Sequence, residues 1–218
     1  MNMSFEFSEK YDLLSQLDDE QIKHLVTVKV KKGEIIYHQG DAPTGVYHVK
    51  NGHIGLITFA PNGNETLLRV FGPNYFFGHR SLISNEDYHA TTMALVDSEL
   101  IFIPSSDFDN IVHAKPNILM HVAQVLAKEL RRAENKFRDL ANSNVTSRII
   151  QALAFIKTRY PDHKWTRKEI GEYCGAKTET VSRVLGRLEK EGLIVKEGRG
   201  IVIPSIEKLY ERAEELDE

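Results

Sequence analysis

The stretch "KTETVSRVLGRLEKEG", from Lys177 to Gly192, has two distinct faces if it forms a helix. One face is apolar, with residues at i, i+3, i+4 and i+7, the spacing of a single helix stripe: Val181, Val184, Leu185 and Leu188. The opposite face repeats this spacing with short side chains, one carboxylate and one guanidinium: Glu179, Ser182, Arg183 and Gly186. A solvated face more often carries long Lys and Glu side chains, so we expect the second face to meet a partner.

The residues on either side of this helix predict a winged helix-turn-helix. Thr166 is placed to cap a preceding helix, with Glu169 at the capping-box position, and Gly175 breaks that helix. Behind the second helix, "LIVKEGRGIVIP" reads as a tight hairpin that turns at residues 198–200. In such a motif the second helix buries its apolar stripe and presents its other face to the major groove of DNA.

The geometry of the major groove explains the composition of that face. Arg183 can bond the O6 and N7 atoms of guanine, and Glu179 can accept a hydrogen bond from the amino group of cytosine. Ser182 is short enough to let the helix backbone approach, while Lys177, Thr178 and Arg199 are expected to contact phosphates. The alternative is a solvated helix in a small protein-binding winged helix.

Bulk charge does not predict a nucleic-acid partner, but local charge does. The net charge is −3, with 28 Lys and Arg against 31 Asp and Glu. Residues 164–199 hold nine Lys or Arg against six Asp or Glu, whereas residues 207–218 hold two against six. The basic surplus therefore surrounds the helix described above, and an acidic tail hides it in the total.

Cysteine usage and hydropathy indicate a cytoplasmic protein. One cysteine, Cys174, excludes an internal disulfide and fits a reducing compartment. No apolar run approaches the roughly 20 residues of a membrane span, and the N-terminus does not read as a signal peptide.

The N-terminal half predicts many short strands. From about Val26 to Ile103, β-rich runs alternate with turn signals, and Asn51-Gly52 is a strong two-residue hairpin signal. Strands of this kind indicate a sandwich, barrel or jelly roll. Before them, Asp18 reads as a helix N-cap with Gln21 three residues on.

A long helix is predicted from Pro116 to about Leu140. Its apolar residues step by three or four, as in a coiled-coil seam: Leu119, Val122, Leu126, Leu130, Ala133, Phe137 and Leu140. We expect this stripe, from Leu119 to Phe137, to form a dimer interface, with the alternative that it packs on its own N-terminal domain. The polar segment 141–144 reads as a hinge. The predicted organisation is α+β: a jelly-roll-like domain of short strands (1–115), a helix expected to dimerise (116–140) and a DNA-binding domain (141–218).

The sequence resembles the CRP/FNR family of bacterial transcription regulators along nearly its whole length. The stretch "WTRKEIGEYCGAKTETVSRVLGRLEKEGLI" is similar to the family's C-terminal domain, and "FGPNYFFGHRSLI" resembles part of its cyclic-nucleotide-binding β-roll. Glu179, Ser182 and Arg183 resemble the E-x-x-S-R pattern of the FNR branch, which implies binding to TTGAT half-sites. The resemblance implies that residues 1–115 form a β-roll sensor domain. It also implies double-stranded DNA, a second copy of the chain and RNA polymerase as partners.

The effector pocket departs from the pattern of the family's nucleotide-binding members. Those members carry a Glu directly after the Gly of the cassette and an Arg-Ser pair further on. Here Gly78 precedes His79, and His89-Ala90 stands in place of Arg-Ser. We therefore expect no tight binding of cyclic AMP, with Arg80 as the one residue that could restore it. The candidate pocket residues are Gly78, His79, Arg80, Ser81 and His89.

The sequence also bears on iron–sulfur, redox, haem and metal sensing. The family's iron–sulfur sensors need an N-terminal cysteine cluster, which this sequence lacks. We expect Cys174 to be a buried structural thiol, with a redox switch as the alternative. A haem ligand stays open among six histidines: His24, His38, His48, His53, His79 and His89. No metal-ligand cluster or nucleophile–base pair favours an enzyme, and a cupin-like metalloenzyme is a poor alternative.

Together these features predict a homodimeric, sequence-specific transcription regulator. An effector would shift the balance between two arrangements about the 141–144 hinge, through its different affinity for each of them. One alternative is the same DNA binder without an effector, controlled by its own abundance. Another is a cyclic-nucleotide-type module that serves as a protein-interaction subunit, which the winged helix argues against.

Overall fold

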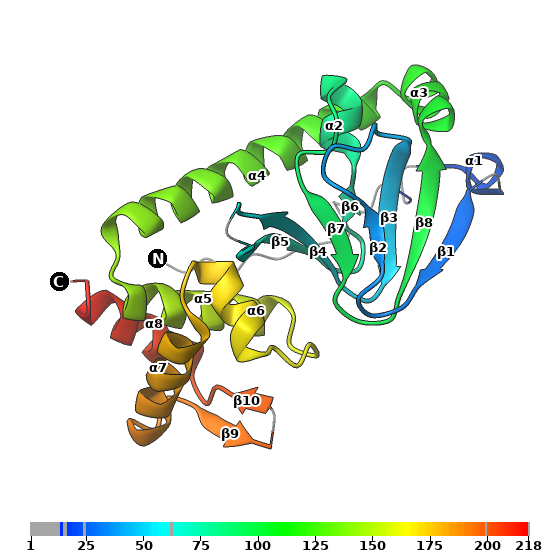
Figure 1. The fold of residues 1–218 in the computed structure, drawn as a ribbon. Coiled ribbons are helices and arrows are strands. Elements are labelled where there is room, and N and C mark those ends of the chain that lie inside the picture. The colour runs from blue at the N-terminus through cyan, green and yellow to red at the C-terminus, as the bar shows by residue number, and fades with distance from the viewer. Residues whose placement is uncertain (1–13, 15–16, 24, 62, 199, 218) are drawn as a thin grey trace. The chain divides into compact units, whose positions relative to one another are not determined.

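The computed structural model of the protein describes residue 14 and residues 17–23, 25–61, 63–198 and 200–217 (Figure 1). Contacts divide the chain into two compact units. The first comprises residues 1–60 and 68–129, and the second comprises residues 61–67 and 130–218.

The first unit contains a β-roll. Its strands form two four-stranded sheets, with the orders β1-β8-β3-β6 and β2-β7-β4-β5. The strands are β1 (Val26–Val30), β2 (Ile35–Tyr37), β3 (Gly45–Asn51), β4 (Ile54–Phe59), β5 (Glu65–Phe71), β6 (Phe76–Phe77), β7 (Thr91–Ala94) and β8 (Ser98–Pro104). A short helix, α1 (Asp19–Lys23), precedes them, and the Asp18 and Gln21 side chains each accept the other's backbone N–H, which confirms the predicted cap.

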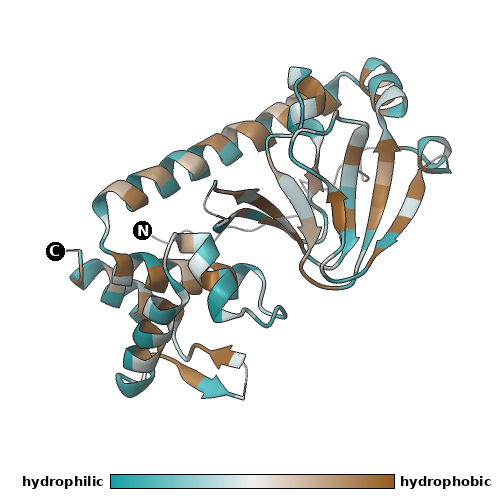
Figure 2. Cartoon of the chain, viewed as in Figure 1, coloured by the Kyte–Doolittle hydropathy of each residue, from teal (hydrophilic) through white to brown (hydrophobic). Residues whose placement is uncertain are grey.

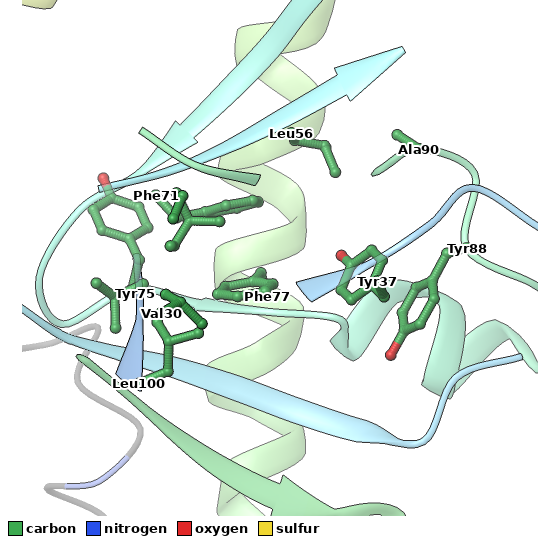
Figure 3. Close-up of a cluster of buried hydrophobic side chains, with 12 residues drawn as sticks. Val30, Tyr37, Leu56, Phe71, Tyr75, Phe77, Tyr88, Ala90 and Leu100 are labelled. Carbon is green, nitrogen blue, oxygen red and sulfur yellow. The ribbon is translucent and has the colours of Figure 1, made fainter. Parts of the chain in front are cut away.

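The core of the β-roll lies between the two sheets. Val49 and Leu100 come from one sheet, and Ile54 and Phe71 come from the other, and all four are buried in one cluster. Figure 3 shows part of this cluster, in which aromatic rings from several strands lie close together. Figure 2 shows the matching hydrophobic colouring along these strands. The jelly-roll-like fold class predicted from the strand pattern is confirmed.

The predicted hairpin at Asn51-Gly52 is wrong. β3 pairs with β6 and β8, whereas β4 pairs with β7 and β5, so the turn connects one sheet to the other. Gly52 has φ +89°, and a Cβ there would collide with the Ser98 side chain. The turn chemistry was read correctly, but strand pairing depends on residues far away in the sequence.

One helix, α2 (His79–Ser84), lies between β6 and β7. Two more follow β8: α3 (Ser105–Ala114) and α4 (Asn117–Asn142). A second buried cluster joins Val46 and Ile103 of the β-roll to Phe108 of α3 and Ile118 of α4. α4 is continuous to Asn142, two residues beyond the predicted end, so the break in the helix falls at residues 143–144.

Burial on α4 corrects one predicted interface residue. Val122 is 2% exposed and packs in the same cluster as Phe76 and Phe108, so it cannot serve a second copy of the chain. The side chains of Leu130 and Phe137 are instead 62% and 75% exposed. The single stripe expected from sequence is therefore divided between a buried face and an exposed face.

The second unit contains the winged helix-turn-helix, whose elements are α5 (Val145–Arg159), α6 (Arg167–Cys174), α7 (Thr178–Lys190), β9 (Val195–Glu197), β10 (Gly200–Val202) and α8 (Ile206–Glu215). α5 packs against α6, α7 and α8. β9 and β10 pair antiparallel with Glu197 opposite Gly200, which confirms the predicted hairpin.

The ends of α6 confirm the predicted helix signals. Thr166 and Glu169 form both bonds of the capping box, and Gly175 ends the helix in the left-handed conformation, with φ 68°. The loop before α6 is also fixed. Trp165 is buried and donates its indole N–H to the Tyr160 carbonyl at 3.4 Å, and the His163 ring packs against it edge-on at 4.4 Å.

Side chains from the end of α8 hold the start of α5. Asn144 caps α5 by accepting from the backbone N–H groups of Thr146 and Ser147. The Asp217 carboxylate accepts from the Asn144 backbone N–H at 3.0 Å and from the Ser147 hydroxyl at 2.7 Å. The segment predicted as a hinge is thus bonded to a residue that lies far away in sequence.

Two helical glycines in this unit should respond oppositely to alanine. A Cβ at Gly171 would lie 2.5 Å from the Ala176 carbonyl oxygen in the turn between α6 and α7. We expect Gly171→Ala to destabilise the protein by about 1–3 kcal/mol, because backbone must move to admit the methyl group. A Cβ at Gly186 meets nothing within 4 Å, so Gly186→Ala should stabilise by about 0.5–1 kcal/mol.

Urea unfolding of both variants, followed by circular dichroism, measures these changes. A Gly171→Ala protein as stable as the unmodified protein would contradict the close approach at the turn.

Candidate functional site

The exposed face of α7 is positioned by the burial of its opposite face. The apolar stripe is fully buried at Val181, Val184, Leu185 and Leu188, as predicted. This burial turns Glu179 and Arg183 outward, where both are exposed. Within the part of the chain that the structure describes, neither side chain makes a hydrogen bond or an ion pair.

Neighbouring charges at the end of α7 behave differently. Lys196 pairs with Glu189 at 2.7 Å, and Arg212 pairs with Glu191 at 3.0 Å. Among the described residues, none neutralises the exposed guanidinium of Arg183. Arg187 lies one turn further along the same exposed face and was not singled out from sequence, although its i+4 spacing from Arg183 was a usable signal.

Ser182 and Gly186 have short side chains and let a partner approach the backbone of α7 closely. The Ser182 hydroxyl donates to the Thr178 carbonyl at 2.9 Å, so its proton is used within the helix and its oxygen stays free to accept. Gly186 has open space where a Cβ would be. A glycine inside a helix costs about 1 kcal/mol relative to alanine, and no contact within the described unit explains this one.

The predicted phosphate contacts lie at the start of α7 and in the wing. Lys177 is the N-cap residue of α7 and does not cap with its side chain, and Thr178 is the first residue of the helix. Both are exposed. Arg199 lies outside the described residues.

The five predicted pocket residues come together in the β-roll. Gly78, His79, Arg80, Ser81 and His89 all line one pocket of the first unit. Its cavity volume is about 20 Å³, close to the space that one water molecule needs.

Aromatic rings fill much of this pocket. Tyr37 and Tyr88 stack with their ring centroids 3.5 Å apart and their planes 8° from parallel, as Figure 3 shows. Phe71 and Phe77 also line the pocket and stack at 5.1 Å. Burial raises the pKa of Tyr88 to about 12. A ligand the size of a nucleotide could enter only if some of these rings moved.

The two pocket histidines are held in the neutral form. His79 is 1% exposed, and burial, followed by the charges of Arg80 and Arg69, lowers its pKa to about 3. The same causes, in the same order, lower the pKa of His89. Neither ring can therefore supply a positive charge at neutral pH to replace an arginine.

Sequence reasoning missed a buried ion pair beside the pocket. Arg69 of β5 pairs with Glu129 of α4, and Glu129 lines the pocket. A signal was present, because Glu129 falls at i+11 from Ile118 on the buried face of α4 that also holds Val122 and Val125. A carboxylate on a buried stripe requires a partner.

Cys174 is buried, as expected. Its thiol lies 3.8 Å from the Gly171 carbonyl oxygen, and burial raises its pKa to about 11. The thiol is therefore protonated at neutral pH, which opposes a redox role.

Metal and haem have little geometric support. Among the described residues, no group of three or more His, Cys, Asp or Glu side chains could hold a metal ion. The pocket that contains His79 and His89 is far too small for a haem, and His24 lies outside the described residues. No described helix is long and apolar enough to cross a membrane.

A β-roll, a long helix and a winged helix-turn-helix in this order are typical of a DNA-binding regulator. Residues 27–115 match the cyclic nucleotide-binding domain family, and residues 147–212 match the Crp-like helix-turn-helix domain. The chain belongs to the CRP/FNR family of transcription regulators.

Individual relatives match along most of their length. The CRP-like cAMP-activated global transcriptional regulator of Mycobacterium tuberculosis is 26% identical over 200 residues, which cover 88% of this chain and 89% of the relative. The cAMP-activated global transcriptional regulator CRP of Pasteurella multocida is 28% identical, covering 84% and 91%. A solved CRP/FNR-family regulator from Thermus thermophilus has a TM-score of 0.74 and 28% identity, covering 87% and 98%.

The raised pKa of Cys174 predicts that its thiol is alkylated slowly. At pH 8 we expect iodoacetamide to label the native protein at least about 100-fold more slowly than the urea-unfolded protein, because the thiolate fraction is small and the sulfur is covered. Mass spectrometry of timed samples gives both rates. Equal rates in the two states would revive the redox alternative.

Proposed function

We propose that the protein acts as a homodimer and reads palindromes of the type TTGAT, spacer, ATCAA. Arg183 and Glu179 contact base edges, Ser182 allows close approach, and Lys177 and Thr178 contact phosphates, together with Arg199. The observation that carries this proposal is the exposed and unpaired Glu179 and Arg183 opposite a fully buried stripe. The half-site follows from the resemblance of Glu179, Ser182 and Arg183 to the FNR-branch pattern.

The exposed face of α4 supports the dimer. Leu130 and Phe137 are largely exposed, and Leu119 and Leu140 are each 45% exposed. A row of large apolar side chains on one helix is costly in water, and a second copy of the helix would cover it. A two-fold axis would place two copies of α7 about 34–36 Å apart, one turn of DNA.

Control by cyclic AMP is not part of this proposal. The cyclic phosphate is an anion, and neutral His79 and His89 stand where nucleotide-binding relatives use Glu and Arg-Ser. The small cavity favours a regulator that binds DNA at a level set by its own abundance. Contact with RNA polymerase and a cytoplasmic location complete the proposal and follow from the family.

Base reading by Arg183 is tested by its removal. We expect Arg183→Ala to weaken binding to a TTGAT palindrome by about 1–3 kcal/mol per half-site and to relax preference at the guanine. Lys177→Ala serves as a phosphate-contact control. It should weaken all sequences alike and lower the salt slope by about one unit.

Gel shifts across salt concentrations, together with selection from random DNA, measure both effects. Recovery of a TGTGA-type site would contradict the assignment of Glu179, Ser182 and Arg183.

The dimer interface is tested on the same helix. Leu130→Glu combined with Phe137→Glu should give monomers that lose operator binding, because two carboxylates would be buried in the apolar seam. Gln124→Glu, an exposed change on α4 away from this face, should leave the dimer intact. Light scattering gives the mass and gel shift gives the affinity. Tight specific binding by the monomeric variant would rule the model out.

A further inference from the structure

The buried face of α4 contains a carboxylate. Glu129 is 6% exposed and shares this face with Ile118, Val122 and Val125. One carboxylate oxygen pairs with Arg69, whose side chain is only 19% exposed. The other, Oε2, has no hydrogen-bond partner among the described residues. A buried carboxylate with a free oxygen is costly unless the site favours negative charge.

The surroundings of Glu129 do favour negative charge. Burial is the main cause of the lowered pKa of His79 and His89, and the charges of Arg80 and Arg69 lower it further, so two guanidinium groups act on this pocket. Among the residues that line the pocket, Glu129 is the sole acid. His79 is almost fully buried there, and neither of its ring nitrogens has a hydrogen-bond partner among the described residues. The pocket is therefore built around an anion, and the chain supplies that anion itself.

We propose that Glu129 is a tethered anion that occupies the anion position of the pocket and holds α4 on β5 without any effector. A small oxyanion can bind there only by displacing the Glu129 carboxylate from Arg69. Removing the carboxylate charge therefore converts the pocket into a binding site for a free oxyanion such as inorganic phosphate.

The ion pair also bears on the dimer. Glu129 is the last residue of the first unit, and Leu130, on the exposed face proposed as the interface, follows it directly in α4. Loss of the pair removes the contact of α4 with Arg69 of β5 at the position directly before Leu130. This consequence for DNA binding rests on the proposed function, whereas the anion site itself does not.

The test uses Glu129→Gln in the full-length protein. The amide keeps the size of the side chain but leaves Arg69 without a counter-ion, so we expect the melting temperature to fall by about 5 °C in chloride buffer. Replacing chloride with 50 mM phosphate at constant ionic strength should return at least about half of that loss, because phosphate binds the folded state. The unmodified protein should shift by less than about 1 °C, since its site is filled.

Two variants serve as matched controls. Glu134→Gln makes the same change at an exposed position of α4 and should behave like the unmodified protein. Glu129→Gln combined with Arg69→Gln removes both charges. It should be more stable than Glu129→Gln alone and should not respond to phosphate. A phosphate response of Glu129→Gln no larger than that of Glu134→Gln would overturn the proposal, and so would a full response in the double variant.

If Glu129→Gln does not accumulate as folded protein, a second variant with a shorter acidic side chain tests the proposal. Glu129→Asp keeps the charge but withdraws it from Arg69 by one methylene, so its phosphate response should exceed that of the unmodified protein. A response equal to that of the unmodified protein would count against the tethered anion.

Operator binding provides a separate test of the link between the ion pair and DNA binding. In chloride, Glu129→Gln should bind a TTGAT palindrome at least about tenfold more weakly than the unmodified protein does, and phosphate should reduce this gap. Equal affinities would overturn the link between the ion pair and DNA binding. If the unmodified protein bound no such palindrome, the proposed function would fail, while the melting measurements would still decide the anion site.

Discussion

The architecture depends on one constraint: α4 must bury one face on the β-roll while it leaves a neighbouring face open. Ile118, Val122 and Val125 satisfy the first requirement, and Leu130 and Phe137 satisfy the second. Residues spaced alternately by three and four do not stay on one side of an ideal α-helix. Their position shifts by about 20° around the helix axis with each heptad. The Arg69–Glu129 pair lies where the buried face ends. An ion pair thus joins α4 to β5 at the residue where the buried face ends, and Lys136, further along α4, adds a hydrogen bond to the Leu67 carbonyl.

Local signals in the sequence were read correctly because their physics is local. A capping box needs Thr166 and Glu169 three residues apart, and the left-handed end of α6 needs Gly175, so both could be predicted. The burial of Val181 and Leu188 followed from helix periodicity alone. The exposure of Arg183 followed from that burial, and so most of the α7 face that we propose to meet DNA could be predicted from the sequence.

Features that depend on distant residues were missed. The Asn51-Gly52 turn has hairpin chemistry, yet its strands separate into two sheets because their partners are β8 and β7. The stripe on α4 was assigned to one partner, although Val122 is covered by its own β-roll. Arg69 and Glu129 lie 60 residues apart, and no local pattern joins them. The five pocket residues were found because the family resemblance marked them, but the aromatic filling of the pocket was not predicted.

The placement of the single tryptophan makes the two units optically distinct. Trp165 is buried in the loop before α6, against His163 and near Tyr160, so tryptophan emission reports on the winged helix alone. The first unit carries Tyr37, Tyr47, Tyr75 and Tyr88 and no tryptophan, so its unfolding contributes to the near-ultraviolet circular dichroism of the chain but not to this emission. Emission therefore follows the second unit while circular dichroism follows both, and unfolding curves that fail to coincide would reveal an intermediate in which one unit is still folded.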